Sequence, residues 1–301
     1  MQYVEPVYRP PSEAESLIIQ ATIGCPHNKC AFCFLYKGKK FGIRPISDIR
    51  RDIAEAKAVY GNYLRSVFLA DGNCLAMKTS DICEILSACR KAFPSLERIT
   101  SYGASRFLVR NKTPEQLRMI RESGLTRVHV GMESGSDFVL QMMNKGASKK
   151  DHISAGRMVR EAGIELSEYV LLGLGGKEKS GEHASETAEA LNEINPHFIR
   201  FRTLVVSNLT PLWNMYKNGK WTPNTMIEIL VEMRMIIENL ECNSLLLSDH
   251  ITNLVSINGR LPQEKKNLLA EIDCFLGKMK NDEMFTNDRT WALSEDGCPR
   301  I

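Results

Sequence analysis

Short apolar runs alternate with longer segments of helical periodicity between residues 17 and 204, and this alternation restricts the fold more than any other feature. The runs of strand-forming residues lie at 17–22, 66–70, 97–100, 127–131, 165–172 and 197–204. Apolar residues recur at helical spacing at 46–60, 79–93, 113–123, 149–162 and 181–194. Repeated strand–helix units predict a parallel sheet, because parallel neighbours need a crossover connection. The pattern alone leaves an open doubly wound sheet and a partial barrel as alternatives.

Local signals predict where several of these helices begin and end. Ser47, Thr79 and Thr113 are residues that cap helix starts through a side-chain oxygen. Gly124 and Gly163 follow helical segments at positions where a helix ordinarily stops. We therefore expect separate helices joined by short turns.

The pattern becomes helical after about residue 205, with helical segments at 222–240 and 263–280. No linker, repeat or low-complexity tract divides the chain, so we expect one continuous domain. Its core spans residues 1–205, and residues 206–301 form a helical C-terminal extension that packs on the core and contributes to the substrate pocket.

The composition is that of a soluble globular protein, with 43% hydrophobic and 25% charged residues. A formal net charge of +3 gives no general attraction for polyanions. No segment resembles a signal peptide or reaches transmembrane length. Nine cysteines in such a chain indicate a reducing compartment, so we expect a cytoplasmic protein without a membrane partner.

Three cysteines, Cys25, Cys30 and Cys33, lie within nine residues directly after the first apolar run. A loop that leaves a strand end can wrap three thiolates around one iron–sulfur cube. Three ligands for four irons leave one iron open to a cofactor or substrate. A structural zinc site needs four ligands, and His27 lies awkwardly between the first two cysteines. These residues favour a cluster, with zinc and unliganded thiols as the alternatives.

A three-cysteine loop after the first strand of a six-unit α/β chain resembles the radical S-adenosylmethionine (SAM) superfamily. The segment from Thr210 to Gly219 resembles a helix that is common in the branch of methylthiotransferases, the elongator catalytic subunit and coproporphyrinogen dehydrogenases. The first cysteine gap has four residues instead of the usual three, and Phe32 occupies the aromatic position. The resemblance covers about residues 15–220 and implies a partial (β/α)6 TIM-like barrel of parallel strands with a helical C-terminal extension. It also implies a 4Fe–4S cluster on Cys25, Cys30 and Cys33, with SAM on the open iron.

The same resemblance places SAM contacts at successive strand ends. Taken alone, each of these segments also reads as an ordinary turn. The residues implied are Phe32 and the pair Leu172 and Gly173 near adenine, Asp71, Gly72 and Asn73 for the ammonium group, Ser105 and Arg106 for the ribose or carboxylate, and Glu133 for the ribose hydroxyls.

Two segments are expected to bind and act on the substrate. Arg200 and Arg202 alternate along one strand, so their side chains share a face and can pair with a carboxylate or phosphate, or form a structural ion pair. Asp249, His250 and Asn253 form a polar cluster between apolar segments. His250 is expected to donate a proton, and its neighbours to bind hydroxyls or amines.

The resemblance implies reductive cleavage of SAM to a 5′-deoxyadenosyl radical, which abstracts a hydrogen atom from a small-molecule substrate. The favoured substrate is a nucleoside, in a lyase reaction that releases queuine from queuosine. The alternatives are oxidative decarboxylation or dehydrogenation of a carboxylated substrate such as a porphyrinogen, and a non-enzymatic iron–sulfur or zinc protein. A low-potential electron donor such as flavodoxin or ferredoxin is the expected partner. The sequence has no second cluster motif and no separate RNA-binding segment, so no large nucleic acid is expected.

Overall fold

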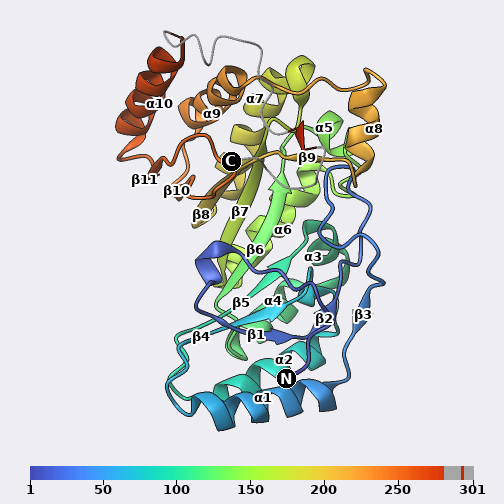
Figure 1. Ribbon diagram of the computed structural model, residues 1–301. Coiled ribbons are helices and arrows are strands. Elements are labelled where there is room, and N and C mark those ends of the chain that lie inside the picture. Colours follow the sequence, from blue (N-terminus) through green and yellow to red (C-terminus); the bar gives the residue numbers. More distant parts are fainter. Residues whose placement is uncertain (281–292, 295–301) are drawn as a thin grey trace. The chain divides into compact units, whose positions relative to one another are not determined.

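The computed structural model describes residues 1–280 and 293–294 of the chain, which divides into two compact units (Figure 1). The first unit comprises residues 1–28, 35–130 and 154–167, and the second comprises 29–34, 131–153 and 168–301. Three elements begin in one unit and end in the other, namely β6 (Arg127–Glu133), α6 (Lys149–Glu161) and β7 (Glu165–Leu172).

The first unit is built on a parallel sheet whose strands follow the order β1-β4-β5-β6. Helices α1 and α2 pack side by side in this unit (Figure 1). Its elements are the short helix η1 (Pro11–Glu13), β1 (Leu17–Gln20), β2 (Thr22–Ile23), β3 (Gly42–Ile43), α1 (Ile46–Tyr60), β4 (Ser66–Ala70), η2 (Cys74–Ala76), α2 (Thr79–Ala92), β5 (Arg98–Gly103), α3 (Ser105–Asn111) and α4 (Pro114–Glu122).

Strand β4 shows why the apolar runs were readable from the sequence. All five of its residues are buried, as expected for a parallel strand that is covered on both faces. Its register places Val67 opposite Leu17 of β1 and opposite Ile99 of β5. The predicted parallel α/β arrangement is therefore confirmed.

The predicted helix ends were partly right. Thr113 accepts a hydrogen bond from the backbone N–H of Gln116 and forms a capping box, as expected. Gly124 and Gly163 follow helices with positive φ angles of 125° and 75°. The predicted caps at Ser47 and Thr79 are wrong, because α1 and α2 begin at or before these residues, which leaves their side chains inside the first turn.

The second unit contains the C-terminal ends of β6 and β7 and most of the later elements. Strand β10 pairs in parallel with β8 and antiparallel with β11. Helix α9 packs against α7 and also against α10 (Figure 1). The elements are α5 (Asp137–Met142), α7 (Gly176–Ile194), β8 (Phe198–Thr203), β9 (Val206–Ser207), α8 (Pro211–Lys217), α9 (Met226–Asn239), β10 (Leu245–Leu247), β11 (Asn258–Arg260), α10 (Lys265–Lys280) and β12 (Leu293–Ser294).

The region after residue 205 is less purely helical than the sequence predicts. Helices α9 and α10 occur where they are expected, but β10 and β11 between them extend the sheet beyond β8. Strands of three residues are too short to show a periodicity, and for that reason they were missed. The expected extension also includes residues 281–292 and 295–301, which lie outside the described residues. Across the described residues, no helix is both long and apolar enough to cross a membrane.

Candidate functional site

The cysteine loop connects β2 to β3, and the carboxylate of Asp71 holds its first residues in the first unit. The backbone N–H of Gly24 donates to Asp71 Oδ2 at 3.0 Å, and the N–H of Gly72 donates to the Gly24 carbonyl at 3.2 Å. Lys39 forms an ion pair with the same carboxylate at 3.3 Å. Burial raises the pKa of Asp71 despite these partners. Asp71, expected to hold the SAM ammonium, thus uses one oxygen to position the loop.

Gly72 permits the loop to lie against the end of β4. A Cβ atom at Gly72 would lie 3.2 Å from Cys25 Cβ and 3.1 Å from the Gly24 carbonyl oxygen. A larger residue would therefore push the first cysteine away. The next residue, Asn73, is fully buried, and neither polar atom of its amide has a partner among the described residues. A buried, unpaired amide is costly without a ligand, which fits the expected role of Asn73.

Residues Lys29–Phe34, which carry Cys30 and Cys33, are fastened by backbone hydrogen bonds within the second unit. The N–H of Ala31 donates to the Met143 carbonyl at 2.8 Å, and the N–H of Leu212 donates to the Ala31 carbonyl at 3.0 Å. Phe32 packs against the same apolar cluster as Ala31. The turn after α5 and the start of α8 therefore fix this part of the loop, although the sequence gives no sign of either contact.

Lys145 is a site residue that the sequence did not reveal. Its ammonium group lies 5.8 Å from the ring centroid of Phe32 and 3.0 Å from Glu133 Oε1. Burial opposes its charge, but Glu133 and the nearby Cys30 and Cys33 outweigh burial and raise the pKa of Lys145. Lys145 therefore places an ammonium group near two of the three cysteines.

Glu133 ends β6 with a left-handed backbone, at φ 68°. Such a conformation is unfavourable for a residue with a side chain and recurs at functional sites. The Glu133 carboxylate folds back over Gly131, where a Cβ atom would lie 2.1 Å from Oε1. Gly135, two residues further on, approaches α7 and donates its N–H to Thr187 Oγ1 at 2.9 Å. Gly131 thus leaves the space that the Glu133 carboxylate occupies, and this carboxylate is paired with Lys145.

Glu168 is a second residue that the sequence analysis did not select. It is fully buried in β7, and neither carboxyl oxygen has a partner among the described residues. Burial raises the pKa of Glu168 well above its ordinary value, although the charge of Lys145 opposes this shift. A carboxyl group in a strand whose last three residues, Val170 to Leu172, are all apolar was the available signal.

The remaining predicted SAM residues occupy two other strand ends. Ser105 and Arg106 are the first two residues of α3, after β5. Leu172 is buried at the end of β7. The N–H of Gly173 donates to Glu232 Oε1 of α9 at 2.6 Å, which fixes this glycine turn.

The structure brings the two predicted substrate segments together within the second unit. Arg200 and Arg202 of β8 both lie against the carboxylate of Asp249, at 3.6 and 3.7 Å. Asn253 donates to the Phe201 carbonyl at 2.9 Å, so the loop between β10 and β11 is tied to β8. Burial and the charge of Arg202 lower the pKa of His250 to about 4, which leaves its ring neutral at neutral pH.

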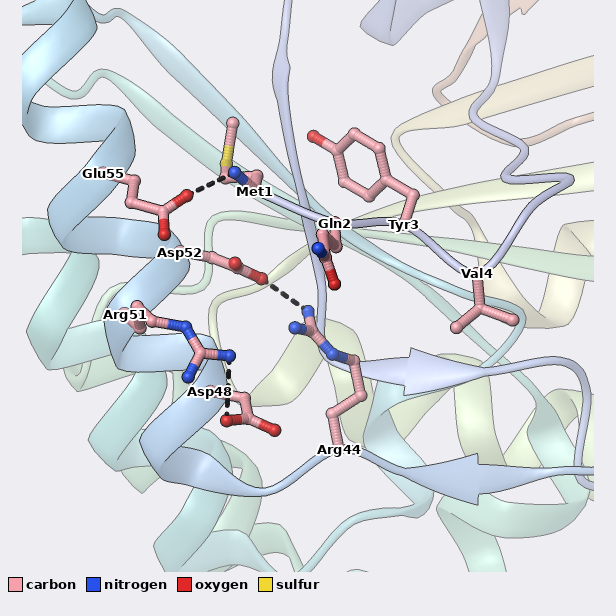
Figure 2. Close-up of a pocket in the computed structure, with 9 residues that line it drawn as sticks. All are labelled: Met1, Gln2, Tyr3, Val4, Arg44, Asp48, Arg51, Asp52 and Glu55. Atoms are coloured by element: carbon pink, nitrogen blue, oxygen red, sulfur yellow. Dashed lines mark hydrogen bonds and ion pairs between the residues drawn. The ribbon is translucent and has the colours of Figure 1, made fainter.

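A cavity of about 640 Å³ lies elsewhere, between residues 1–4, Arg44 and helix α1 (Figure 2). None of the predicted site residues lines it. Its charged groups pair with one another, Arg44 with Asp52 at 2.6 Å and Arg51 with Asp48 at 3.0 Å. We therefore do not assign this cavity to the active site.

The donor set of the cysteine loop fits an iron–sulfur cluster. Cys25, Cys30 and Cys33 are partly exposed cysteines outside any disulfide, and thiolates are the ligands of such clusters. Over residues 1–280 and 293–294, no three Cys, His, Asp or Glu side chains are already grouped as a metal site. The chemistry of these three donors is therefore what the structure itself contributes in favour of a cluster.

Comparisons with known proteins agree on the family and on the fold. A family model described as the Radical SAM superfamily matches residues 19–191. The tRNA uridine(34) acetyltransferase of Methanocaldococcus jannaschii is 21% identical over 239 residues, which are 66% of this chain and 44% of that protein. The chain spans less than half the length of each curated relative reported for it.

Two solved structures share the fold at low sequence identity. Methylornithine synthase (PylB) gives a TM-score of 0.52 at 15% identity and covers 86% of this chain and 81% of its own. An N-terminally truncated Elp3 of Methanocaldococcus infernus gives a TM-score of 0.52 at 14% identity, with coverages of 82% and 60%. The mainly parallel α/β sheet is thus of the partial-barrel type. Because the family model matches more than half of the sequence, the chain belongs to the radical SAM superfamily, whose cofactors are a 4Fe–4S cluster and SAM.

Proposed function

We propose that the protein cleaves SAM reductively and abstracts a hydrogen atom from a small-molecule substrate. The observation that supports this most strongly is the family match over residues 19–191, which includes the loop of Cys25, Cys30 and Cys33. When bound, the cluster and SAM supply a 5′-deoxyadenosyl radical. A low-potential donor such as flavodoxin or ferredoxin supplies the electron.

The residues of the chain have distinct roles in this proposal. The three cysteines hold the cluster, and the Lys145 ammonium keeps Cys30 and Cys33 in a field that favours thiolates. Asn73 offers an amide donor and acceptor to the polar end of SAM, and Glu133 accepts from ribose hydroxyls. Anaerobic purification, a visible spectrum and an assay for 5′-deoxyadenosine test the proposal. A coloured cluster without SAM cleavage would instead indicate an electron carrier, and tightly held zinc would indicate a structural site.

Asn73→Leu is expected to weaken SAM binding without lowering the stability of the fold. Leucine has a similar volume and removes two unpaired buried polar atoms, so the free energy of unfolding should stay level or rise. Loss of a hydrogen bond to a charged group should weaken SAM binding by about 1.5–3 kcal/mol. Equilibrium binding of SAM to the reconstituted protein and urea unfolding measure the two effects. A variant with lowered stability and unchanged SAM affinity would show that Asn73 is structural.

We further propose that the substrate is a nucleoside from which a lyase reaction releases the base, and queuosine is the nucleoside with which this is tested. The reconstituted protein, with reductant, SAM and queuosine, should release queuine together with 5′-deoxyadenosine, because abstraction of a ribose hydrogen permits the glycosidic bond to break. Chromatography of both products measures this. Formation of 5′-deoxyadenosine without queuine would reject queuosine as the substrate while leaving the radical chemistry in place.

Two other substrate classes have support. Arg200 and Arg202 favour oxidative decarboxylation of a carboxylated substrate, for which release of carbon dioxide that depends on the substrate is the readout. The relative named as a tRNA uridine(34) acetyltransferase favours tRNA, although the chain spans less than half of that protein. Parallel reactions with a porphyrinogen and with bulk tRNA separate these classes from the lyase.

A further inference from the structure

The turn after α5 lies along the part of the cysteine loop that carries its last two cysteines. The N–H of Ala31 donates to the Met143 carbonyl at 2.8 Å, and the side-chain amide of Asn144 donates to the Lys29 carbonyl at 3.2 Å. Both contacts lie within the second unit. They bring the backbone just before Lys145 against this part of the loop.

The ammonium group of Lys145 lies close to the last two cysteines of the loop. It is 5.8 Å from the ring centroid of Phe32, which directly precedes Cys33 in the chain. The side chain of Lys145 is 15% exposed. Burial opposes its charge, but the nearby Glu133, Cys30 and Cys33 outweigh burial and raise the pKa of the ammonium group. A positive charge is thus placed near two expected cluster ligands, where water screens it little.

The carboxylate of Glu133 is paired with this ammonium group. Glu133 Oε1 lies 3.0 Å from Lys145 Nζ, and the side chain of Glu133 is 17% exposed. Gly131 leaves room for both groups, because a Cβ atom at that residue would lie 2.1 Å from Glu133 Oε1 and 3.2 Å from Lys145 Nζ. The two opposite charges therefore lie together over one glycine, beside the cysteine loop.

Two other buried titratable groups lie near Lys145, and both favour their uncharged forms. Burial raises the pKa of Glu168 on β7 well above its ordinary value, although the charge of Lys145 opposes this shift. Burial and the charge of Lys145 lower the pKa of His152 on α6 to about 3. Among these four residues, Lys145 and Glu133 therefore carry the formal charges at neutral pH.

We propose that Lys145 and Glu133 set the reduction potential of the iron–sulfur cluster in opposite directions, the ammonium group raising it and the carboxylate lowering it. An electron that enters the cluster adds negative charge, which a nearby cation stabilises and a nearby anion destabilises. The pair thereby decides how strong a reductant the cluster needs. The inference rests on the proposed function, because it requires the cluster that Cys25, Cys30 and Cys33 are proposed to hold.

The test is a redox titration of the reconstituted protein with dithionite and mediators in the absence of SAM. Electron paramagnetic resonance of the reduced cluster gives the midpoint potential. Lys145→Met should make this potential more negative, because a positive charge is lost, and Glu133→Gln should make it more positive. Each change should alter the equilibrium constant for reduction by about tenfold, which corresponds to about 59 mV for a one-electron couple.

Two further variants and a control separate charge from damage to the fold. The double variant of Lys145→Met and Glu133→Gln should have a potential between those of the single variants, because it loses one charge of each sign. Lys145→Arg keeps the charge and should retain the potential of the unmodified protein. The matched control is Lys149→Met, which removes another ammonium group that is 15% exposed in the same unit, paired with Glu186 at 2.5 Å and Glu189 at 2.8 Å. Its potential should equal that of the unmodified protein.

Several outcomes would overturn the proposal. These are shifts of both single variants in the same direction, potentials equal to that of the unmodified protein, and an equal shift in Lys149→Met. If Lys145→Met fails to fold, the other variants decide, since Glu133→Gln must have a more positive potential than both the unmodified protein and the double variant.

The midpoint potential also separates this inference from the proposed function, because no SAM is present in the titration. A cluster with the expected shifts in a protein that cleaves no SAM would support the inference and reject the proposed activity. Cleavage of SAM by variants with unshifted potentials would reject the inference alone. A protein that takes up no cluster after reconstitution would reject both.

Discussion

Cys30→Ala is expected to abolish both the iron–sulfur cluster and the formation of 5′-deoxyadenosine from SAM. The cluster already has one iron without a protein ligand, and in this variant only the thiolates of Cys25 and Cys33 remain to hold the other three irons. Changes outside the ligand shell alone cost about 10–100-fold in metal affinity or activity, so loss of a ligand should exceed about 100-fold. Iron and sulfide content, the visible spectrum and the yield of 5′-deoxyadenosine, all measured after anaerobic reconstitution, check this result.

The matched control is Cys274→Ala, which changes an exposed free cysteine on α10. Its iron content and SAM cleavage should equal those of the unmodified protein. Cleavage retained in Cys30→Ala would contradict the assignment of the cluster. Loss in both variants would indicate general damage from cysteine replacement. Circular dichroism of each apoprotein separates a missing ligand from a misfolded chain.

Glu13→Ala is expected to lower the free energy of unfolding by about 3–5 kcal/mol, because it leaves buried partners unpaired. Glu13 is fully buried and accepts from Ser16 at 2.7 Å and from Arg98 at 3.3 Å. His129 Nε2 lies 3.2 Å from its other oxygen. Urea unfolding followed by circular dichroism measures the change. The control is Glu97→Ala, in an exposed pair with Arg65, which should cost at most about 1 kcal/mol.

The same carboxylate predicts a loss of stability in acid. Burial alone would raise the pKa of Glu13, but the hydrogen bonds from His129 and Ser16 and the charge of Arg98 lower it from 4.5 to about 2. A carboxyl group with a depressed pKa in the folded state stabilises the protein above about pH 4.5, and this contribution is lost as the pH falls toward 2. The free energy of unfolding of Glu13→Ala should therefore fall less steeply between these pH values than that of the unmodified protein. Equal acid profiles would show that Glu13 does not contribute.

The short C-terminal strands and two of the helix caps mark the limits of what local sequence can predict. Thr113 was predicted correctly because a capping box involves residues three apart. Ser47 and Thr79 have the right residue type, but the first turn of each helix already includes them. Strand β10 exists because it pairs with β8, and β11 because it pairs with β10; such pairing is not a property of either segment alone.

The sequence by itself determined the parallel α/β fold and the three thiols of the cluster loop. Continuous apolar strands, helical periodicity and cysteine spacing are local patterns, and each depends on residues close together in the chain. Only the tertiary structure decided which charges meet. Lys145 reaches Glu133 from the far side of α5, and Glu168 is enclosed without a partner among the described residues. Arg200 and Arg202 share an aspartate almost fifty residues away. Burial and charge pairing depend on what the rest of the chain places around a side chain, and no local pattern records them.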